Sequence, residues 1–238
     1  SGNGKMVRTG VAAASGARTR LTFTKCMTIQ PETGRVLHAV DDFYKELAPL
    51  GVKPLSDRSL DFFIPNTDRE AVARKLAEAG VSASDRLLVI NPAASRPLNR
   101  WPLERFRAVA AHWAAQPGVK VAVTGAPASF KTVMDGLDEV GLARDVALAD
   151  EHIGAAVGTP LVVLSGAADP DRTGPLTENS AVLIDRTLPC VPCRDRICAR
   201  LDMMCMQNLS VPAVISALGL RMNLPERKPR GIALPISA

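Results

Sequence analysis

Short apolar runs alternate with amphipathic segments between residues 85 and 185. The apolar runs are typical of buried strands, and the amphipathic segments place apolar residues at helical spacings of three and four. Apolar strands separated by helices predict a parallel sheet covered on both faces. The predicted strands are 86–90, 119–125, 145–149, 161–165 and 181–185, and the predicted helices run from Pro102 to about residue 116, over 129–140, and over a short stretch after residue 150.

The chain before residue 85 has a less regular pattern. Two helices are predicted there, over 38–51 and 68–80, because apolar residues recur on one face of each. Residues 60–67 between them are expected to form a linker or a short strand. Too few strands lie here to build a sheet alone. Towards the other end, a helix over 211–220 precedes a tail rich in proline and arginine.

The composition is that of a globular protein. Of the 238 residues, 47% are hydrophobic, which is enough for one large core or two small ones. The sequence has no apolar run near the roughly 20 residues of a membrane span and no signal-peptide pattern, so a cytoplasmic protein is expected. The net charge of +5 favours anionic ligands. No block of basic residues is interleaved with aromatic ones, so nucleic acid is not expected as a partner, whereas phosphorylated small molecules or an anionic lipid surface fit.

Ligands of parallel α/β sheets bind beyond the carboxyl ends of the strands. Three loops follow such ends, at 91–100, 124–129 and 165–175, and all are rich in Gly, Pro, Ser or Thr. Phosphate-binding backbone and ordinary turns both use these residues. His152 lies in the first turn of the short helix after residue 150, where it either belongs to a capped helix start or binds a phosphate or a sugar hydroxyl. Structural roles are expected for His38 and His112.

Four of the five cysteines are close together in the sequence, with the spacing C-x2-C-x4-C-x6-C. Four thiolates are chemically suited to tetrahedral zinc, but structural zinc sites usually pair two tight C-x2–4-C hairpins, and only the first pair here has that spacing. Reduced thiols are therefore favoured over a metal site. The cysteines are Cys190, Cys193, Cys198 and Cys205.

The order of several motifs resembles glycosyltransferase family 9, the ADP-heptose:lipopolysaccharide heptosyltransferases. VINPAASRPLNRWPLERF is similar to the start of the family's donor domain, and VAVTGAP, HIGAAVGTPLVVLSGAADPDRTGP and CVPCRDRICARLDMMCMQNL follow in the family's order. SGARTRLTF and HAVDDFYKELAPLGV resemble pieces of the acceptor domain. The resemblance covers most of the chain.

The resemblance implies an α/β fold of the GT-B type, with two Rossmann-like parallel-sheet domains. It implies a partial N-terminal acceptor-type domain over 1–80, a nucleotide-sugar-binding domain over 85–206, and a C-terminal helix and tail over 207–238. The implied reaction is an inverting, metal-independent transfer of heptose from ADP-heptose to a lipopolysaccharide inner-core acceptor, without a cofactor. Peripheral association with the cytoplasmic face of the inner membrane also follows from it.

The resemblance also implies which residues bind the donor. They are Ser95, Asn99, Arg100, Thr124, Gly125, His152 and Gly154. Asn99 stands where the family has lysine, which leaves Arg100 as the nearest cation for a diphosphate.

Two segments of the family pattern are expected to be missing. Ala147, Leu148 and Ala149 stand where the family has Asp, Thr or Ser, and Gly, so a segment before His152 is absent. The first N-terminal strand, whose Gly-Asp loop supplies the family's catalytic base, is also expected to be absent, and no residue of this chain is assigned as base. Two alternatives therefore stay open. One is a fragmentary or inactive nucleotide-sugar-binding module of the same descent, and the other is a cysteine-based metal-binding module.

Overall fold

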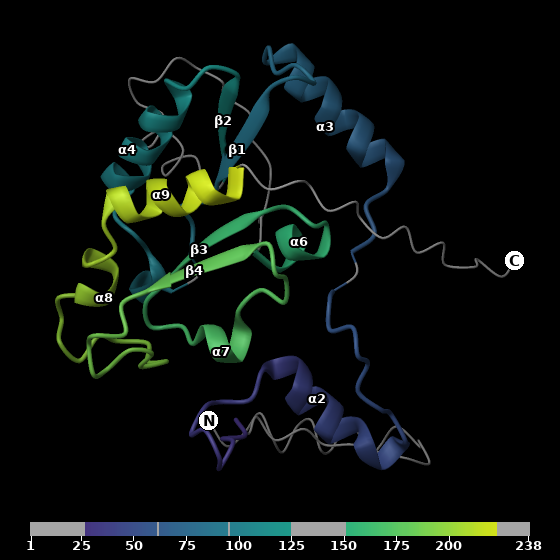
Figure 1. Cartoon of the computed structure of the whole chain (residues 1–238), viewed down its shortest axis with the longest axis vertical. Coiled ribbons are helices and arrows are strands. Elements are labelled where there is room, and N and C mark those ends of the chain that lie inside the picture. Colours follow the sequence, from purple (N-terminus) through teal and green to yellow (C-terminus); the bar gives the residue numbers. More distant parts are fainter. Residues whose placement is uncertain (1–26, 61, 95, 125–150, 223–238) are drawn as a thin grey trace, which may run out of the picture. The chain divides into compact units, whose positions relative to one another are not determined.

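The computed structural model describes residues 27–60, 62–94, 96–124 and 151–222, and the chain forms two compact units (Figure 1). The first unit consists of Ser1–Arg58 together with Asp171–Thr173, and the second of Ser59–Pro170 and Gly174–Ala238. All strands in the described residues belong to the second unit. No helix in this part of the chain is long and apolar enough to cross a lipid bilayer.

The first unit is built around helix α2, Ala39–Leu47. His38 lies at the N-cap rather than inside the helix, and its Nδ1 accepts a hydrogen bond from the backbone N–H of Val40 at 3.3 Å. This bond satisfies one of the free donors of the first turn, which is the structural role predicted for His38. An antiparallel bridge between Ile29 and Val36 precedes the helix. A 3-10 turn, η1, follows at Ala48–Leu50.

A buried carboxylate organises the interior of the first unit. Asp42 of α2 is 4% exposed and pairs with Arg172, whose guanidinium also donates to the Leu37 carbonyl at 3.0 Å. Burial by itself would raise the pKa of Asp42, but hydrogen bonds from Thr28 and the charge of Arg172 hold that pKa below its usual range. Asp42 is therefore kept as a charged, hydrogen-bonded group inside the unit.

The second unit contains two parallel pairs of strands (Figure 1). Strand β1, Arg86–Ile90, pairs with β2, Val119–Val123, and strand β3, Leu161–Ser165, pairs with β4, Ser180–Ile184. Helix α4, Leu103–Ala114, connects β1 to β2. The predicted parallel α/β architecture is confirmed, although the described strands form two two-stranded sheets. The helix predicted over 129–140 and the strand over 145–149 lie outside the described residues.

Most predicted element bounds agree with the structure. Strands 86–90 and 161–165 are confirmed as predicted, β2 ends two residues early, and β4 begins one residue early. The remaining long helices are α3, Asn66–Glu78, and α9, Val211–Met222, and the short helix after residue 150 is α6, Glu151–Ala156. Three elements were not predicted because each has only three or four residues, too few for a helical pattern to repeat. They are η2 (Pro97–Asn99), α7 (Pro170–Thr173) and α8 (Met204–Gln207).

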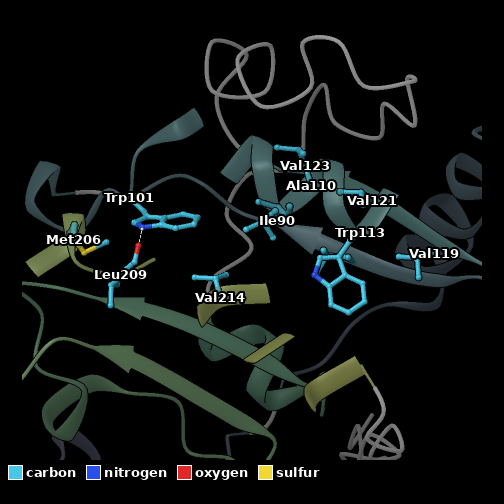
Figure 2. Close-up of a cluster of buried hydrophobic side chains, with 12 residues drawn as sticks. Ile90, Trp101, Ala110, Trp113, Val119, Val121, Val123, Met206, Leu209 and Val214 are labelled. Atoms are coloured by element: carbon cyan, nitrogen blue, oxygen red, sulfur yellow. Dashed lines mark hydrogen bonds between the residues drawn. The ribbon is translucent and has the colours of Figure 1, made fainter. Parts of the chain in front are cut away.

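The core of the second unit is continuous from β1 and β2 to α4, α8 and α9 (Figure 2). Trp101, 2% exposed, lies next to Met206, and its indole N–H donates to the Leu209 carbonyl at 2.9 Å. The ring of Phe106 meets that of Trp101 edge-on at 4.9 Å. Arg105 adds a second hydrogen bond to the Leu209 carbonyl at 3.0 Å. The segment between α8 and α9 is thus fastened to the start of α4.

Two substitutions of Trp101 should separate the contribution of its packing to stability from the contribution of its hydrogen bond. We expect Trp101→Ala to lower the free energy of unfolding by about 3–5 kcal/mol, because it leaves a cavity in the core. Trp101→Phe should cost only ~1–2 kcal/mol, since the Leu209 carbonyl keeps its bond from Arg105. Urea unfolding measures both, with the exposed Arg107→Ala on α4 as the control. Equal losses in the two Trp101 variants would contradict this account.

Candidate functional site

The carboxyl ends of the strands finish in step within each sheet. Ile90 pairs with Val123 at the end of the first sheet, and Ser165 pairs with Ile184 at the end of the second. The loops that follow therefore start at one edge of each sheet, which is where parallel α/β proteins bind ligands. Two of the three predicted donor loops, those after β1 and β3, lie within the described residues for most of their length.

Thr124 is the first residue after β2 and is 6% exposed. Its backbone N–H donates to the Ile90 carbonyl at 2.8 Å, which extends the pairing of β1 and β2 by one bond. Its hydroxyl oxygen is buried and has no hydrogen-bond partner within the described part of the chain. Leaving such a group unsatisfied costs about 1–3 kcal/mol, so a ligand that bonds to it would recover stability. The neighbouring predicted donor residue, Gly125, lies outside the described residues.

The loop after β1 holds the predicted cation. Arg100 is exposed, and its Nε donates to the Ala94 carbonyl at 3.1 Å, so the side chain is folded back on its own loop. Earlier in the same loop, the side-chain oxygen of Asn91 accepts from the backbone N–H of Ala93 at 3.1 Å. Ser95, the other predicted donor residue of this loop, lies outside the described residues.

Asn99 joins the loop after β1 to the loop after β3. Its side-chain oxygen accepts a hydrogen bond from the backbone N–H of Ala168 at 3.2 Å. Ala168 is also fixed from its own loop, because the Ser165 hydroxyl donates to the Ala168 carbonyl at 3.0 Å. The structure therefore brings two of the predicted loops together. It also engages one of the two acceptor positions of the Asn99 oxygen, and the amide NH2 group is the donor that this side chain can offer to an anionic ligand.

Sequence reasoning missed a buried ion pair beside this junction. Asp169, with a side chain 4% exposed, accepts from the guanidinium of Arg194 at 2.8 and 3.0 Å. Buried aspartates are rare unless they are paired. The polar loop alone gave no signal for the pair, because Arg194 comes from 25 residues further along the chain.

The structure gives less information on the two residues of α6 that are predicted to bind the donor, His152 and Gly154. Gly154 packs closely against β3, since a Cβ added at this position would lie 2.7 Å from a methyl carbon of Leu161. Close packing of the helix on the strand is thus sufficient reason for glycine there. His152 lies in the first turn of α6, and its side chain is not among those that the structure describes. Donor-binding roles for both residues stay predictions.

The four clustered cysteines are free thiols, with Cys190 exposed and the others half-buried. Within the described residues, no group of three or more His, Cys, Asp or Glu side chains is arranged to hold a metal ion. A backbone hydrogen bond from Met203, supported by others from Arg200, Leu201 and Asp202, holds the pKa of Cys198 below its usual range. Burial raises the pKa of Cys205.

The family model of glycosyltransferase family 9 (heptosyltransferase) matches residues 4–150 and 129–203. This chain belongs to glycosyltransferase family 9. The two matched ranges overlap at residues 129–150. No curated protein sequence matches the chain.

Similar solved structures share the family 9 fold. The family 9 glycosyltransferase of Veillonella parvula is 21% identical, with a TM-score of 0.62 over 86% of this chain and 62% of that one. ADP-heptose lipopolysaccharide heptosyltransferase II of Escherichia coli is 17% identical, with a TM-score of 0.53 over 72% and 55%. E. coli heptosyltransferase WaaC with ADP is 16% identical, with a TM-score of 0.50 over 84% and 60%. The GT-B type is thereby confirmed, and the chain spans less than two thirds of the length of each.

The thiols of this family 9 chain should differ in reactivity. We expect iodoacetamide at pH 7 to modify Cys198 faster than Cys205, because the lowered pKa of Cys198 gives more thiolate while the raised pKa of Cys205 gives less. Mass spectrometry of peptides after timed alkylation measures both rates. Raising the pH should narrow the difference as Cys205 ionises. Faster modification of Cys205 at pH 7 would show that burial does not govern its ionisation.

Proposed function

We propose that this family 9 chain binds ADP-heptose at the carboxyl edge of its second unit, and that the reaction it serves is transfer of heptose to a lipopolysaccharide inner-core acceptor. The observation that carries the proposal is the family match over residues 4–150 and 129–203. The names of the similar E. coli structures, an ADP-heptose heptosyltransferase and a heptosyltransferase with ADP, support this choice of donor. The buried hydroxyl of Thr124, which has no hydrogen-bond partner among residues 27–60, 62–94, 96–124 and 151–222, supports the choice of edge.

The proposed reaction is an inverting displacement without a metal ion. A carboxylate base removes the proton of an acceptor hydroxyl, whose oxygen forms a bond to the anomeric carbon of the heptose. The bond from that carbon to the β-phosphate oxygen breaks, and ADP leaves with the negative charge. Backbone N–H groups and a basic side chain then stabilise the leaving diphosphate. No residue of this chain is proposed as the base.

Arg100 is the proposed cation for the diphosphate. Its Nε is engaged with the Ala94 carbonyl, so the residue is held at the loop after β1 while it remains exposed. The guanidinium has five N–H donors, and one such bond leaves capacity for phosphate oxygens. Asn99 and Thr124 would add an amide and a hydroxyl, and Ser95, Gly125, His152 and Gly154 complete the proposed donor site.

The second candidate is a nucleotide-sugar-binding module of the same descent that does not catalyse transfer. The substitutions Ala147, Leu148 and Ala149 favour it, since they replace polar residues of the family pattern. Ground-state contacts to a donor can persist without the groups that act only in the transition state. The transferase has an anionic lipopolysaccharide precursor as its proposed acceptor. For either candidate, the net charge of +5 suits peripheral association with the cytoplasmic face of the inner membrane.

Calorimetric titration with ADP tests the donor site. We expect Arg100→Ala to weaken ADP binding by about tenfold, which corresponds to the ~1.4 kcal/mol typical of a hydrogen bond to a charged group. Arg107→Ala on α4 is the matched control, because Arg107 is an exposed arginine that is not among the proposed donor residues. Equal affinity in wild type and Arg100→Ala would remove Arg100 from the proposed site.

Binding and turnover should separate in this chain. His152→Ala is expected to reduce the affinity for ADP or ADP-heptose, while the unaltered chain releases no ADP above background with a lipid A–Kdo acceptor, because Ala147, Leu148 and Ala149 replace the polar residues of the family pattern. A coupled assay of ADP release measures turnover. Robust acceptor-dependent release would favour the active transferase over the binding module, and would direct the search for a base to Asp41, Asp150 and Glu151.

A further inference from the structure

We propose that Arg194 is a positioning residue for the donor site, although it lies in the cysteine-bearing segment and not in any of the predicted donor loops. It holds residues 166–169 after β3, and through them it fixes Asn99 and the neighbouring Arg100. The inference rests on the proposed function for its ligand, but its structural part can be tested without one.

The first contact in this chain of interactions is the ion pair between Arg194 and Asp169. The Asp169 side chain is 4% exposed, whereas that of Arg194 is 36% exposed, so the guanidinium closes over the carboxylate from the solvent side. Two N–H groups of the guanidinium reach the same carboxylate oxygen, at 2.8 and 3.0 Å. Removing the arginine would take this ion pair away from a buried carboxylate, which is unfavourable and favours a shift of the loop toward water.

The backbone of Arg194 makes a second contact with the same loop. Its N–H donates to the Ala167 carbonyl at 2.8 Å. Its φ is +59°, in the left-handed region that residues with a Cβ seldom adopt. Glycine would suit this backbone better, so the presence of arginine indicates that its side chain is needed here.

The loop has little freedom to move toward α8. A Cβ added to Gly166 would lie 2.6 Å from the sulfur of Met206 and 3.1 Å from that of Cys205. Met206 is itself 1% exposed and belongs to the core cluster. Gly166 is therefore pressed against the core on one side, while Arg194 holds the loop through Asp169 and Ala167.

The remaining link runs from the loop to the donor site. The N–H of Ala168, between the two residues that Arg194 contacts, donates to the side chain of Asn99 at 3.2 Å. Asn99 is the last residue of η2, and Arg100 follows it directly. A shift of 166–169 would break this bond and free the turn that carries both proposed ligands of the diphosphate.

Three variants test the proposal in the full chain. Arg194→Ala removes the ion pair, and Arg194→Lys keeps the positive charge at the same strained backbone position. Arg196→Ala is the control, because Arg196 is an exposed arginine of the same segment. Hydrogen exchange of the amides of 166–169, measured without nucleotide, should rise in Arg194→Ala only. ADP affinity should fall by about fivefold in Arg194→Ala, within the range for residues that act through others, and by less than about twofold in Arg194→Lys.

A double-mutant cycle shows whether Arg194 acts through Asn99. Combining Arg194→Ala with Asn99→Ala should weaken ADP binding no more than Asn99→Ala does alone. Additive losses, unchanged exchange of 166–169, or a loss in Arg194→Lys as large as in Arg194→Ala would each overturn the proposal. If the unaltered chain binds no ADP, the proposed function fails, and the exchange of 166–169 alone then decides whether Arg194 positions this loop.

Discussion

The carbonyl oxygen of Leu209 accepts two hydrogen bonds, one from the Trp101 indole and one from Arg105, and the second unit depends on this junction. Trp101 and Arg105 flank the start of α4, the helix that leads from β1 to β2. Leu209 lies between α8 and α9, more than a hundred residues away in sequence. Because Leu209 and the Trp101 indole are buried and Arg105 is half-buried, the C-terminal helices are fixed to the sheet by a few directed bonds as well as by apolar packing.

The side chain of Met206 connects this junction to the candidate site. Met206 of α8 lies in the core beside Trp101 (Figure 2). Its side chain also lies close to Gly166, the first residue of the loop after β3. The core thus packs against the start of this loop. Asn99 and Arg194, from two other segments, bind the loop by a hydrogen bond and an ion pair. The polar contacts of Asn99 and Arg194 with the loop after β3 therefore depend on how Met206 packs in the core. Binding residues that are held by packing in this way have their positions fixed before a ligand binds.

The sequence predicted those features that depend on local pattern. The continuous apolar runs at 86–90 and 161–165 gave strands with the observed bounds, and parallel topology correctly predicted that loops would gather at the strand ends. What could not be predicted depends on long-range contact. The hydrogen bond from Ala168 to Asn99 and the pairing of Asp169 with Arg194 have no periodic signature, and the role of Asn99 in donor binding stays a prediction.

Position 194 has two requirements that no single amino acid meets fully. Its left-handed backbone favours glycine, whereas the ion pair with Asp169 requires a cationic side chain. A redesign that inserted glycine there would relieve a backbone cost of about 1 kcal/mol and at the same time remove the arginine that pairs with the buried Asp169. Stabilising this segment would therefore require changing residues 169 and 194 together, for instance by exchanging the aspartate for an uncharged side chain of similar volume. In natural relatives, the same coupling would make the two positions change in concert, so that a glycine at one is accompanied by a neutral residue at the other.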